Sequence, residues 1–130
     1  MSRISKALAW AAGLIGLAAC FAAFAHHSFA GQFDRGQPVA FQGVVTKIEW
    51  QNPHVWFYVD AKDAEDNVIH WEAETTNPNT LLRRGWRHDD LKVGDQVSVE
   101  GFRAICCEHV MNATNVILPD GRNVFSRDGR

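Results

Sequence analysis

The pattern of hydrophobic and polar positions along the chain predicts a small domain built mainly from β-strands. Val39–Trp50 is apolar and rich in β-branched residues, and it contains Gly43, a residue that often marks a bulge or a barrel corner inside a strand. His54–Asp60 and Val68–Thr75 both alternate between apolar and polar side chains, which is typical of half-buried strands. The polar stretch 62–67 separates them, so these two strands are predicted to form a hairpin.

A short helix is predicted directly after the hairpin. Asn77 is a natural N-cap, and Pro78 suits the first helical position because its missing N–H has no helical partner there. Gly85 is placed to end the helix in a left-handed conformation. Trp86 can then pack back onto the last turn.

Two further strands follow, at Gln96–Arg103 and Ala113–Leu118, with a short return at Arg122–Phe125. The order of three strands, a short helix and two strands is the order of an OB-type barrel. Closing the sheet also removes exposed strand edges, which a small domain can rarely cover otherwise. We therefore expect an all-β fold with one short helix, a small OB-like five-stranded barrel, with an open β-sandwich as the alternative.

Residues 1–25 have the pattern of a bacterial export signal. Arg3 and Lys6 precede an uncharged run over 7–24, and Ala23-Phe24-Ala25 is a small-x-small cleavage site. Cleavage there leaves a chain that starts at His26. The rest is then expected to comprise an N-terminal arm at 26–37, a single domain at 38–125 and a frayed tail at 126–130.

A second route of processing competes for the same segment. Leu17-Ala18-Ala19-Cys20 matches the lipobox of bacterial lipoproteins, in which Cys20 becomes the lipidated first residue. A retained membrane helix is a third interpretation, but the run is rich in Ala and Gly and only about long enough to span. All three interpretations place the protein in the periplasm or outside the cell, and a membrane is a partner only if Cys20 is lipidated.

Composition argues against a nucleic acid as the partner. The chain has 13 basic and 15 acidic residues, a net charge of −2, and loss of Arg3 and Lys6 with the signal makes the rest more acidic. Proteins that bind a phosphate backbone need a basic surface instead.

Several motifs resemble a family of small exported bacterial proteins of uncharacterised function. The matching elements are Ala25-His26-His27-Ser28-Phe29, Gly43–Trp50, Asn52-Pro53-His54-Val55-Trp56, Leu81-Leu82-Arg83-Arg84-Gly85-Trp86 and Leu118-Pro119-Asp120-Gly121-Arg122. The resemblance implies a periplasmic single-domain β protein and implies no particular activity. The chain departs from the family pattern at Ile105–Met111, where Cys106-Cys107-Glu108-His109 replaces a polar loop that usually contains glycine.

The first candidate for chemistry is a metal site formed by His26, His27 and His54. If His26 is the first residue, its free amine and ring nitrogen can chelate one ion, and His27 or His54 can supply a third nitrogen. Three nitrogen ligands with an open position suit Cu(II) or Zn(II). The alternative is a solvated arm at 26–27 and a His54 that only caps a strand.

The second candidate is the polar face of the hairpin. If Phe57 lies opposite Ala73 and Val59 lies opposite Trp71, the polar side chains of both strands share the other face. That face is the usual ligand platform of an OB-type barrel, suited to a small cation, a polyamine or a sugar. The ligand-binding residues expected there are Trp56, Tyr58, His70, Glu72 and Glu74. The alternative is ordinary cross-strand stabilisation on a solvated surface, and Glu72 with Glu74 is a weak acid/base pair without a nucleophile.

The third and weaker candidate is a sulfur site formed by Cys106, Cys107 and His109. Thiolates with an imidazole suit Cu(I) or Zn(II). In an oxidising compartment, however, the two thiols are expected to react. Their Cα atoms are about 3.8 Å apart because the residues are adjacent, so a bond between them would be strained and comparatively reducible. A functionless vicinal disulfide, a disulfide to another chain and an incidental loop feature are the alternatives.

No phosphate loop, catalytic-triad motif or haem-attachment motif occurs in the sequence. We therefore expect a non-catalytic periplasmic domain that binds a small molecule or a metal ion, and the expected ligand is copper or zinc held by the His-led N-terminus. The alternative is an accessory module of the envelope that holds a partner protein. A copper-dependent enzyme is the least favoured hypothesis.

Overall fold

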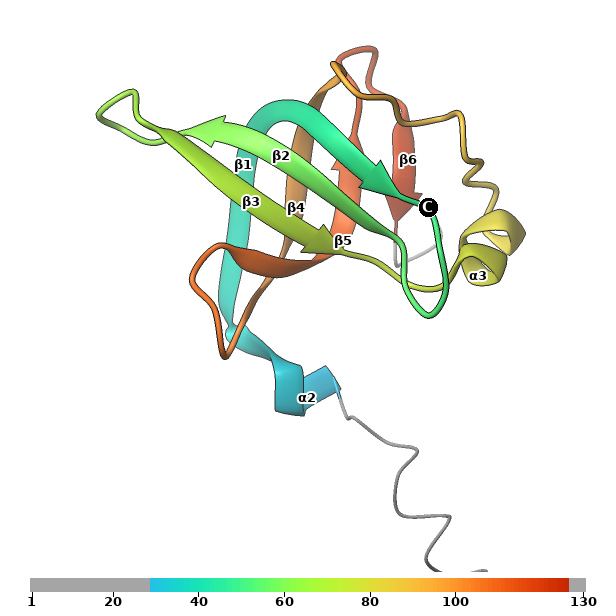
Figure 1. Ribbon diagram of the computed structural model, residues 1–130, viewed down its shortest axis with the longest axis horizontal. Helices are drawn as coiled ribbons and strands as arrows, with labels where there is room; N and C mark the ends of the chain where they lie inside the picture. Colours follow the sequence, from blue (N-terminus) through green and yellow to red (C-terminus); the bar gives the residue numbers. More distant parts are fainter. Residues whose placement is uncertain (1–28, 127–130) are drawn as a thin grey trace, which may run out of the picture.

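The computed structural model describes residues 29–126 and confirms an all-β fold with short helices (Figure 1). Residues 1–25, for which we predict an export signal, His26, His27 and the tail 127–130 lie outside the described residues. The elements are α2 (Phe29–Gln32), β1 (Phe33–Glu49), β2 (Trp56–Lys62), β3 (Val68–Glu74), α3 (Pro78–Arg83), β4 (Gln96–Ala104), β5 (Val110–Ile117) and β6 (Asn123–Ser126).

Five of the strands close into a ring. β1 pairs with β2 on one side and with β4 on the other, β2 pairs with β3, and β4 pairs with β5. A parallel pairing of β3 with β5 completes the ring, and β6 pairs with β5 outside it. This is the strand order expected for an OB-type barrel. The β3–β5 pairing also excludes the open sandwich that we considered as the alternative.

The hairpin register is the one that the alternation predicts. Phe57 lies opposite Ala73 and Val59 opposite Trp71, and all four side chains face the interior. Phe57, Val59 and Ala73 are fully buried. The apolar face of the hairpin therefore forms one wall of the core, and its polar face lies on the other side of the sheet.

β1 starts earlier than the sequence indicates. The strand runs from Phe33, so five residues of the expected arm, 33–37, belong to the sheet. Phe33 is buried and lies opposite Ala104 of β4, whereas the next four residues, 34–37, show no alternation and fall in an irregularity of the register with β4. On its other side β1 pairs with β2 only from Gly43 onward, so residues 33–42 have no strand partner on that side.

A bend in β1 accompanies its pairing with both β2 and β4. The register with β2 shifts between Val45 and Lys47, whereas Gly43, the residue that suggested an irregularity in this strand, keeps a regular pairing with Ala61. Gly43 is required for a different reason, because a Cβ atom there would lie 2.4 Å from the carbonyl oxygen of Asp60 and 2.6 Å from Val59 Cγ1. The glycine thus permits close approach of β1 to β2.

The helix α3 has the predicted ends. The Asn77 side chain accepts a hydrogen bond of 2.9 Å from the Thr80 N–H, with Pro78 in the first turn. Gly85 has φ +88°, and the Trp86 N–H donates to the Leu81 carbonyl oxygen at 2.9 Å. Leu81 and Trp86 are both buried. Within residues 29–126 no helix is long and apolar enough to cross a membrane.

Candidate functional site

The structure brings together two residues that the sequence analysis assigned to different candidates, His54 and Glu74. The Nδ1 atom of His54 contacts the Oε1 atom of Glu74. The Glu74 side chain is only 9% exposed, whereas that of His54 is 45% exposed. No described residue is bonded to the other ring nitrogen, Nε2. The imidazole therefore has one nitrogen held by a buried carboxylate and one available for a ligand.

Backbone pairing fixes this contact. Trp56 lies opposite Glu74, so His54, two residues earlier on the same face, is the diagonal neighbour of Glu74. The Val55 N–H donates to the Thr76 carbonyl oxygen at 3.0 Å, and the Thr75 N–H donates to the Val55 carbonyl oxygen at 2.9 Å. These bonds extend the hairpin beyond the two strands and hold His54 in place.

Burial raises the pKa of Glu74 above its usual range, and the charge and hydrogen bond of His54 oppose that rise. Desolvation is the larger effect, because the carboxylate exchanges water for a mostly protein environment. The His54 imidazole is thus the principal compensating partner of a buried acid.

The pair lines a cavity of about 270 Å³ (the site cavity) between the N-terminal helix and the end of the hairpin. Its wall includes Phe29 and Gln32 of α2, Arg84 at the end of α3, and Asn112 of β5. Asn112 also donates from Nδ2 to the Glu74 carbonyl oxygen at 3.3 Å. Sequence patterns gave no sign of these wall residues, because they come from three distant segments with no shared pattern.

Comparison with known proteins gives one match, to the model of a protein family. The model of a family of unknown function, DUF6152, matches residues 15–108. The chain belongs to that family. No curated protein and no solved structure matches it significantly. The region shared with DUF6152 contains His26, His27, His54 and Glu74, and it ends in the loop before β5, so Asn112 of the site cavity lies beyond it.

The rest of the hairpin face in this DUF6152 member is engaged in contacts of its own. The Tyr58 hydroxyl donates to Glu49 Oε2 at 3.0 Å, and Lys47 Nζ lies 2.5 Å from Glu49 Oε1 and 4.9 Å from the centre of the Tyr58 ring. Partial burial, followed by the bond to Glu49, raises the pKa of Tyr58. Cross-strand stabilisation therefore accounts for Tyr58.

The other expected members of the hairpin face lie in the predicted register, with Tyr58 opposite Glu72 and Trp56 opposite Glu74. The His70 Nδ1 atom lies 2.6 Å from Asp60 Oδ1, and the His70 side chain is 79% exposed. Glu72 is exposed and Trp56 is half-buried. Of the five expected ligand residues, Glu74 lines the site cavity, and the other four do not.

The structure pairs the two loop cysteines with each other. Cys106 and Cys107 form a disulfide, so their sulfurs are not free thiolates. The His109 ring packs edge-on against Trp71 with centroids 5.3 Å apart. Within residues 29–126 no group of three or more His, Cys, Asp or Glu side chains is arranged to hold a metal ion.

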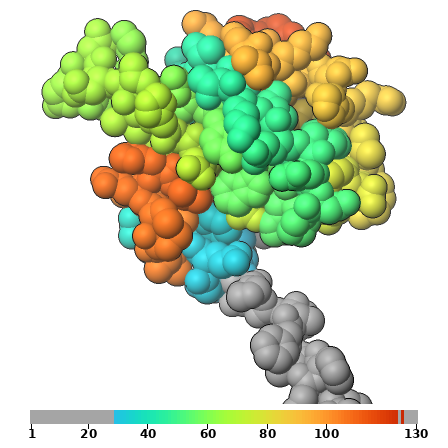
Figure 2. Space-filling model, in the orientation of Figure 1, coloured from blue at the N-terminus to red at the C-terminus, as the bar shows by residue number. Residues whose placement is uncertain are grey.

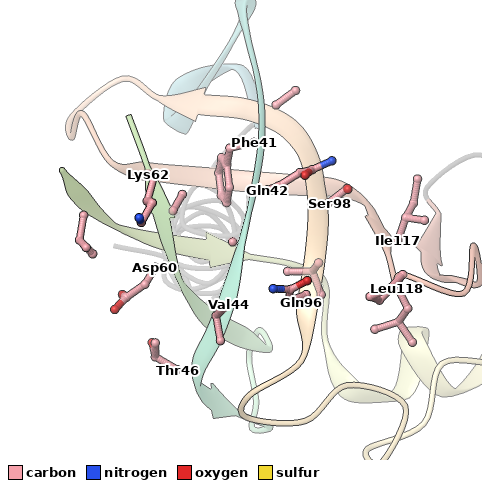
Figure 3. A pocket seen from close by; sticks show the side chains of 16 residues that line it. Phe41, Gln42, Val44, Thr46, Asp60, Lys62, Gln96, Ser98, Ile117 and Leu118 are labelled. Atoms are coloured by element: carbon pink, nitrogen blue, oxygen red, sulfur yellow. The ribbon is translucent and has the colours of Figure 1, made fainter. Parts of the chain in front are cut away.

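A larger hollow of about 960 Å³ borders the bend of β1 (Figure 3). Asp60 and Lys62 of β2 lie on one side of β1, Gln96 and Ser98 of β4 on the other, and Val44 lies between them. The hollow combines apolar and polar side chains and contains none of the predicted ligand residues.

Proposed function

We propose that this protein is an exported, non-catalytic domain that binds a transition metal ion, Cu(II) or Zn(II), at the site cavity. His54 supplies one ligand, and the N-terminal residues His26 and His27 supply the others. The observation that carries the proposal is the His54–Glu74 pair, which lies in a cavity whose wall includes Phe29, three residues after His26.

The His54–Glu74 pair has the chemistry of a metal-binding histidine. Such histidines usually donate one ring N–H to a carboxylate or a carbonyl oxygen, which fixes the tautomer and raises the basicity of the other nitrogen. The contact of His54 Nδ1 with Glu74 supports this arrangement and leaves Nε2 for the ion. Glu74 acts as the orienting residue and does not itself bind the metal.

The covalent chain limits how far the N-terminal histidines can be from His54. An extended chain spans at most about 3.3–3.6 Å per residue, so the His27 Cα atom lies within about 7 Å of that of Phe29. Because Phe29 lines the site cavity with His54, an imidazole at position 27 is within reach of the same ion. Cleavage after Ala25 would add the amine of His26 as a further nitrogen.

An exported location is part of the proposal. Its support is the basic start, the uncharged run and the small-x-small triplet before His26. In that compartment neutral imidazole and amine nitrogens meet copper and zinc without competition from a cytosolic thiol pool.

The first experiment is a calorimetric titration of Cu(II), and separately of Zn(II), into the chain that starts at His26. His54→Ala is expected to weaken binding of the preferred ion at least about tenfold, which corresponds to about 1.4 kcal/mol. The matched control is His70→Ala, which removes an exposed histidine that also pairs with a carboxylate but lies outside the site cavity. Equal affinities for both variants and the unmodified chain would contradict the proposal.

Two more changes separate the roles of the ligands. Adding one alanine before His26 moves the amine away from the imidazole, and is expected to abolish the chelate at the N-terminus. Glu74→Gln is expected to cost about 10–100-fold in affinity, the usual effect of losing an orienting carboxylate. Full affinity in both variants would show that neither the amine nor the carboxylate takes part.

An accessory module of the envelope is the second proposal, favoured by the open hollow at the bend of β1. Intact mass of the protein isolated without chelators distinguishes the two. A chain that starts at His26 and carries one metal ion supports the metal proposal. A chain that starts at lipidated Cys20, without metal, supports the tethered module.

A further inference from the structure

The loop between β4 and β5 carries a disulfide between adjacent, exposed cysteines. Cys106 and Cys107 are both exposed, and their Cα atoms are 3.8 Å apart. Figure 2 shows this loop at the surface beside α2. The metal site proposed above does not use it.

This disulfide has little to contribute to the stability of the fold. A disulfide stabilises a protein mainly by restricting the unfolded chain, and the restriction grows with the number of residues between the cysteines. Here the two cysteines are adjacent in sequence, so the backbone already joins the two residues that the disulfide links.

Hydrogen bonds, rather than the disulfide, hold the loop to the rest of the molecule. The Ile105 N–H donates to the Gln32 carbonyl oxygen in α2 at 2.8 Å. The Glu72 N–H donates to the His109 carbonyl oxygen at 2.9 Å. Both ends of the loop are therefore anchored by contacts that do not depend on the sulfur–sulfur bond.

We propose that the Cys106–Cys107 disulfide is a thiol-exchange site that oxidises dithiols. Adjacent cysteines place their Cα atoms below the usual disulfide range, and such bonds are reduced more readily than ordinary ones. Exposure lets a thiol reach either sulfur. The 60% exposed side chain of Ile105 gives an incoming protein an apolar contact next to the pair.

The exchange takes two steps. One thiolate of the partner attacks the sulfur of one cysteine, a mixed disulfide forms, and the other cysteine leaves as a thiolate. The second thiolate of the partner then attacks the partner sulfur in the mixed disulfide. This releases the cysteine of the loop as a thiolate. The partner gains a disulfide and loses two electrons, Cys106 and Cys107 gain them, and the two partner protons pass through water to the new thiolates.

The test uses reduced glutathione as the probe, with Cys20→Ser so that Cys106 and Cys107 are the only cysteines. The folded protein is incubated with glutathione, alkylated with N-ethylmaleimide and weighed. Most chains are expected to gain two alkyl groups, with one oxidised glutathione formed per chain and an unchanged circular dichroism spectrum. Structural disulfides resist the glutathione pool, so a pair that stays oxidised until the chain is unfolded overturns the proposal.

A second measurement separates exchange from a structural role. The double variant Cys106→Ser, Cys107→Ser is expected to unfold at the same urea concentration as the oxidised protein and to show no reaction with glutathione. A marked fall in that midpoint would show that the disulfide stabilises the fold, and would overturn the proposal.

Discussion

At the scale of single residues, the space left by a neighbouring strand decides which side chain is tolerated. Gly43 is the clearest case, because the backbone of β2 occupies the position that its Cβ atom would take. A rigid carbonyl group cannot move aside as the tip of a long side chain can. The approach of β1 to β2 at the bend therefore depends on the absence of one atom.

Gly43→Ala is expected to lower the free energy of unfolding by about 1–3 kcal/mol, the usual cost of forcing extra volume into a packed site. Urea denaturation followed by circular dichroism measures the change. Gly36→Ala is the control, because the nearest atom there is the side-chain Oδ1 of Asp34 at 3.1 Å, and it should stay within about 0.5 kcal/mol. Equal effects of the two substitutions would contradict the argument.

The candidate site shows what periodicity can and cannot predict for single residues. Alternation assigned Glu74 to the polar face of the hairpin, and its opposite residue, Trp56, was predicted correctly. Alternation gives the face but not the burial, which here depends on α2 and β5 covering the end of β3. The diagonal relation between His54 and Glu74 was a signal available in the predicted register.

At the scale of the elements, local signals at the ends account for α3. The Asn77 side chain accepts a bond from an N–H that the helix would otherwise leave unpaired, Pro78 has no N–H to leave unpaired, and Gly85 adopts the left-handed conformation that ends the helix. Such a short helix has few internal hydrogen bonds, so its ends matter more than its middle. The sequence therefore predicts its position accurately.

Asn77→Ala is expected to reduce stability by about 1 kcal/mol through the lost bond to the Thr80 N–H. Asn79→Ala is the matched control, since this asparagine lies inside the helix, is exposed, and is replaced by a better helix former. Thermal unfolding of both variants distinguishes the cap from a general effect of losing an asparagine. If the control lost as much stability as the cap variant, the cap would have no special role.

The turn of the β2–β3 hairpin makes the stability of the protein depend on pH. The Asp63 carboxylate accepts bonds from the Glu65 N–H at 2.9 Å, the Asn67 N–H at 2.8 Å and Asn67 Nδ2 at 3.0 Å. These bonds, that of the Asn67 side chain above all, lower the pKa of Asp63 below its usual 3.8. Their stabilisation is complete above that value and is lost as pH falls through the lowered pKa in the folded state.

Asp63→Ala is therefore expected to lower the urea midpoint at pH 7, with a difference from the unmodified protein that shrinks in strongly acidic solution. Midpoints measured from pH 7 down to about pH 2 test this. Glu65→Ala, in the same turn, serves as the control and should leave the midpoint unchanged at every pH. A difference for Asp63→Ala that is constant with pH would contradict the role given to its charge.

β1 shows where element prediction fails. It begins at Phe33, and the next four residues, 34–37, do not alternate and precede Pro38, so no local pattern indicates a strand. The strand is defined instead by the pairing of Phe33 with Ala104 and of Pro38 with Phe102 in β4, a partner more than sixty positions further along the chain. Pairing over such a separation has no signature in a window of local sequence.

At the scale of the whole molecule, the ring has one short seam. β3 and β5 share three register pairs, from Glu72 with Val110 to Glu74 with Asn112, whereas β1 and β4 share eight. The same three pairs position Glu74 and Asn112 at the site cavity. The integrity of the candidate site thus depends on the least extensive pairing in the ring.

Hydrogen exchange should reveal this difference. We expect the Glu72 amide, which donates to the His109 carbonyl oxygen, to exchange faster than amides in the middle of the β1–β4 pairing, because short pairings open locally at lower cost. Exchange followed by NMR at neutral pH measures both sets in one sample. Equal protection across the two seams would show that the ring opens only as a unit.

The start of β1, which has no β2 partner, has a consequence for how the protein behaves at high concentration. A strand with an open side can recruit a strand from another copy and begin an aggregate. Here the stretch without a β2 partner includes Asp34, Arg35 and Pro38, and charged residues and proline on an edge oppose such recruitment. The residues that prevent the start of β1 from being predicted from sequence therefore also disfavour self-association of the protein through this strand.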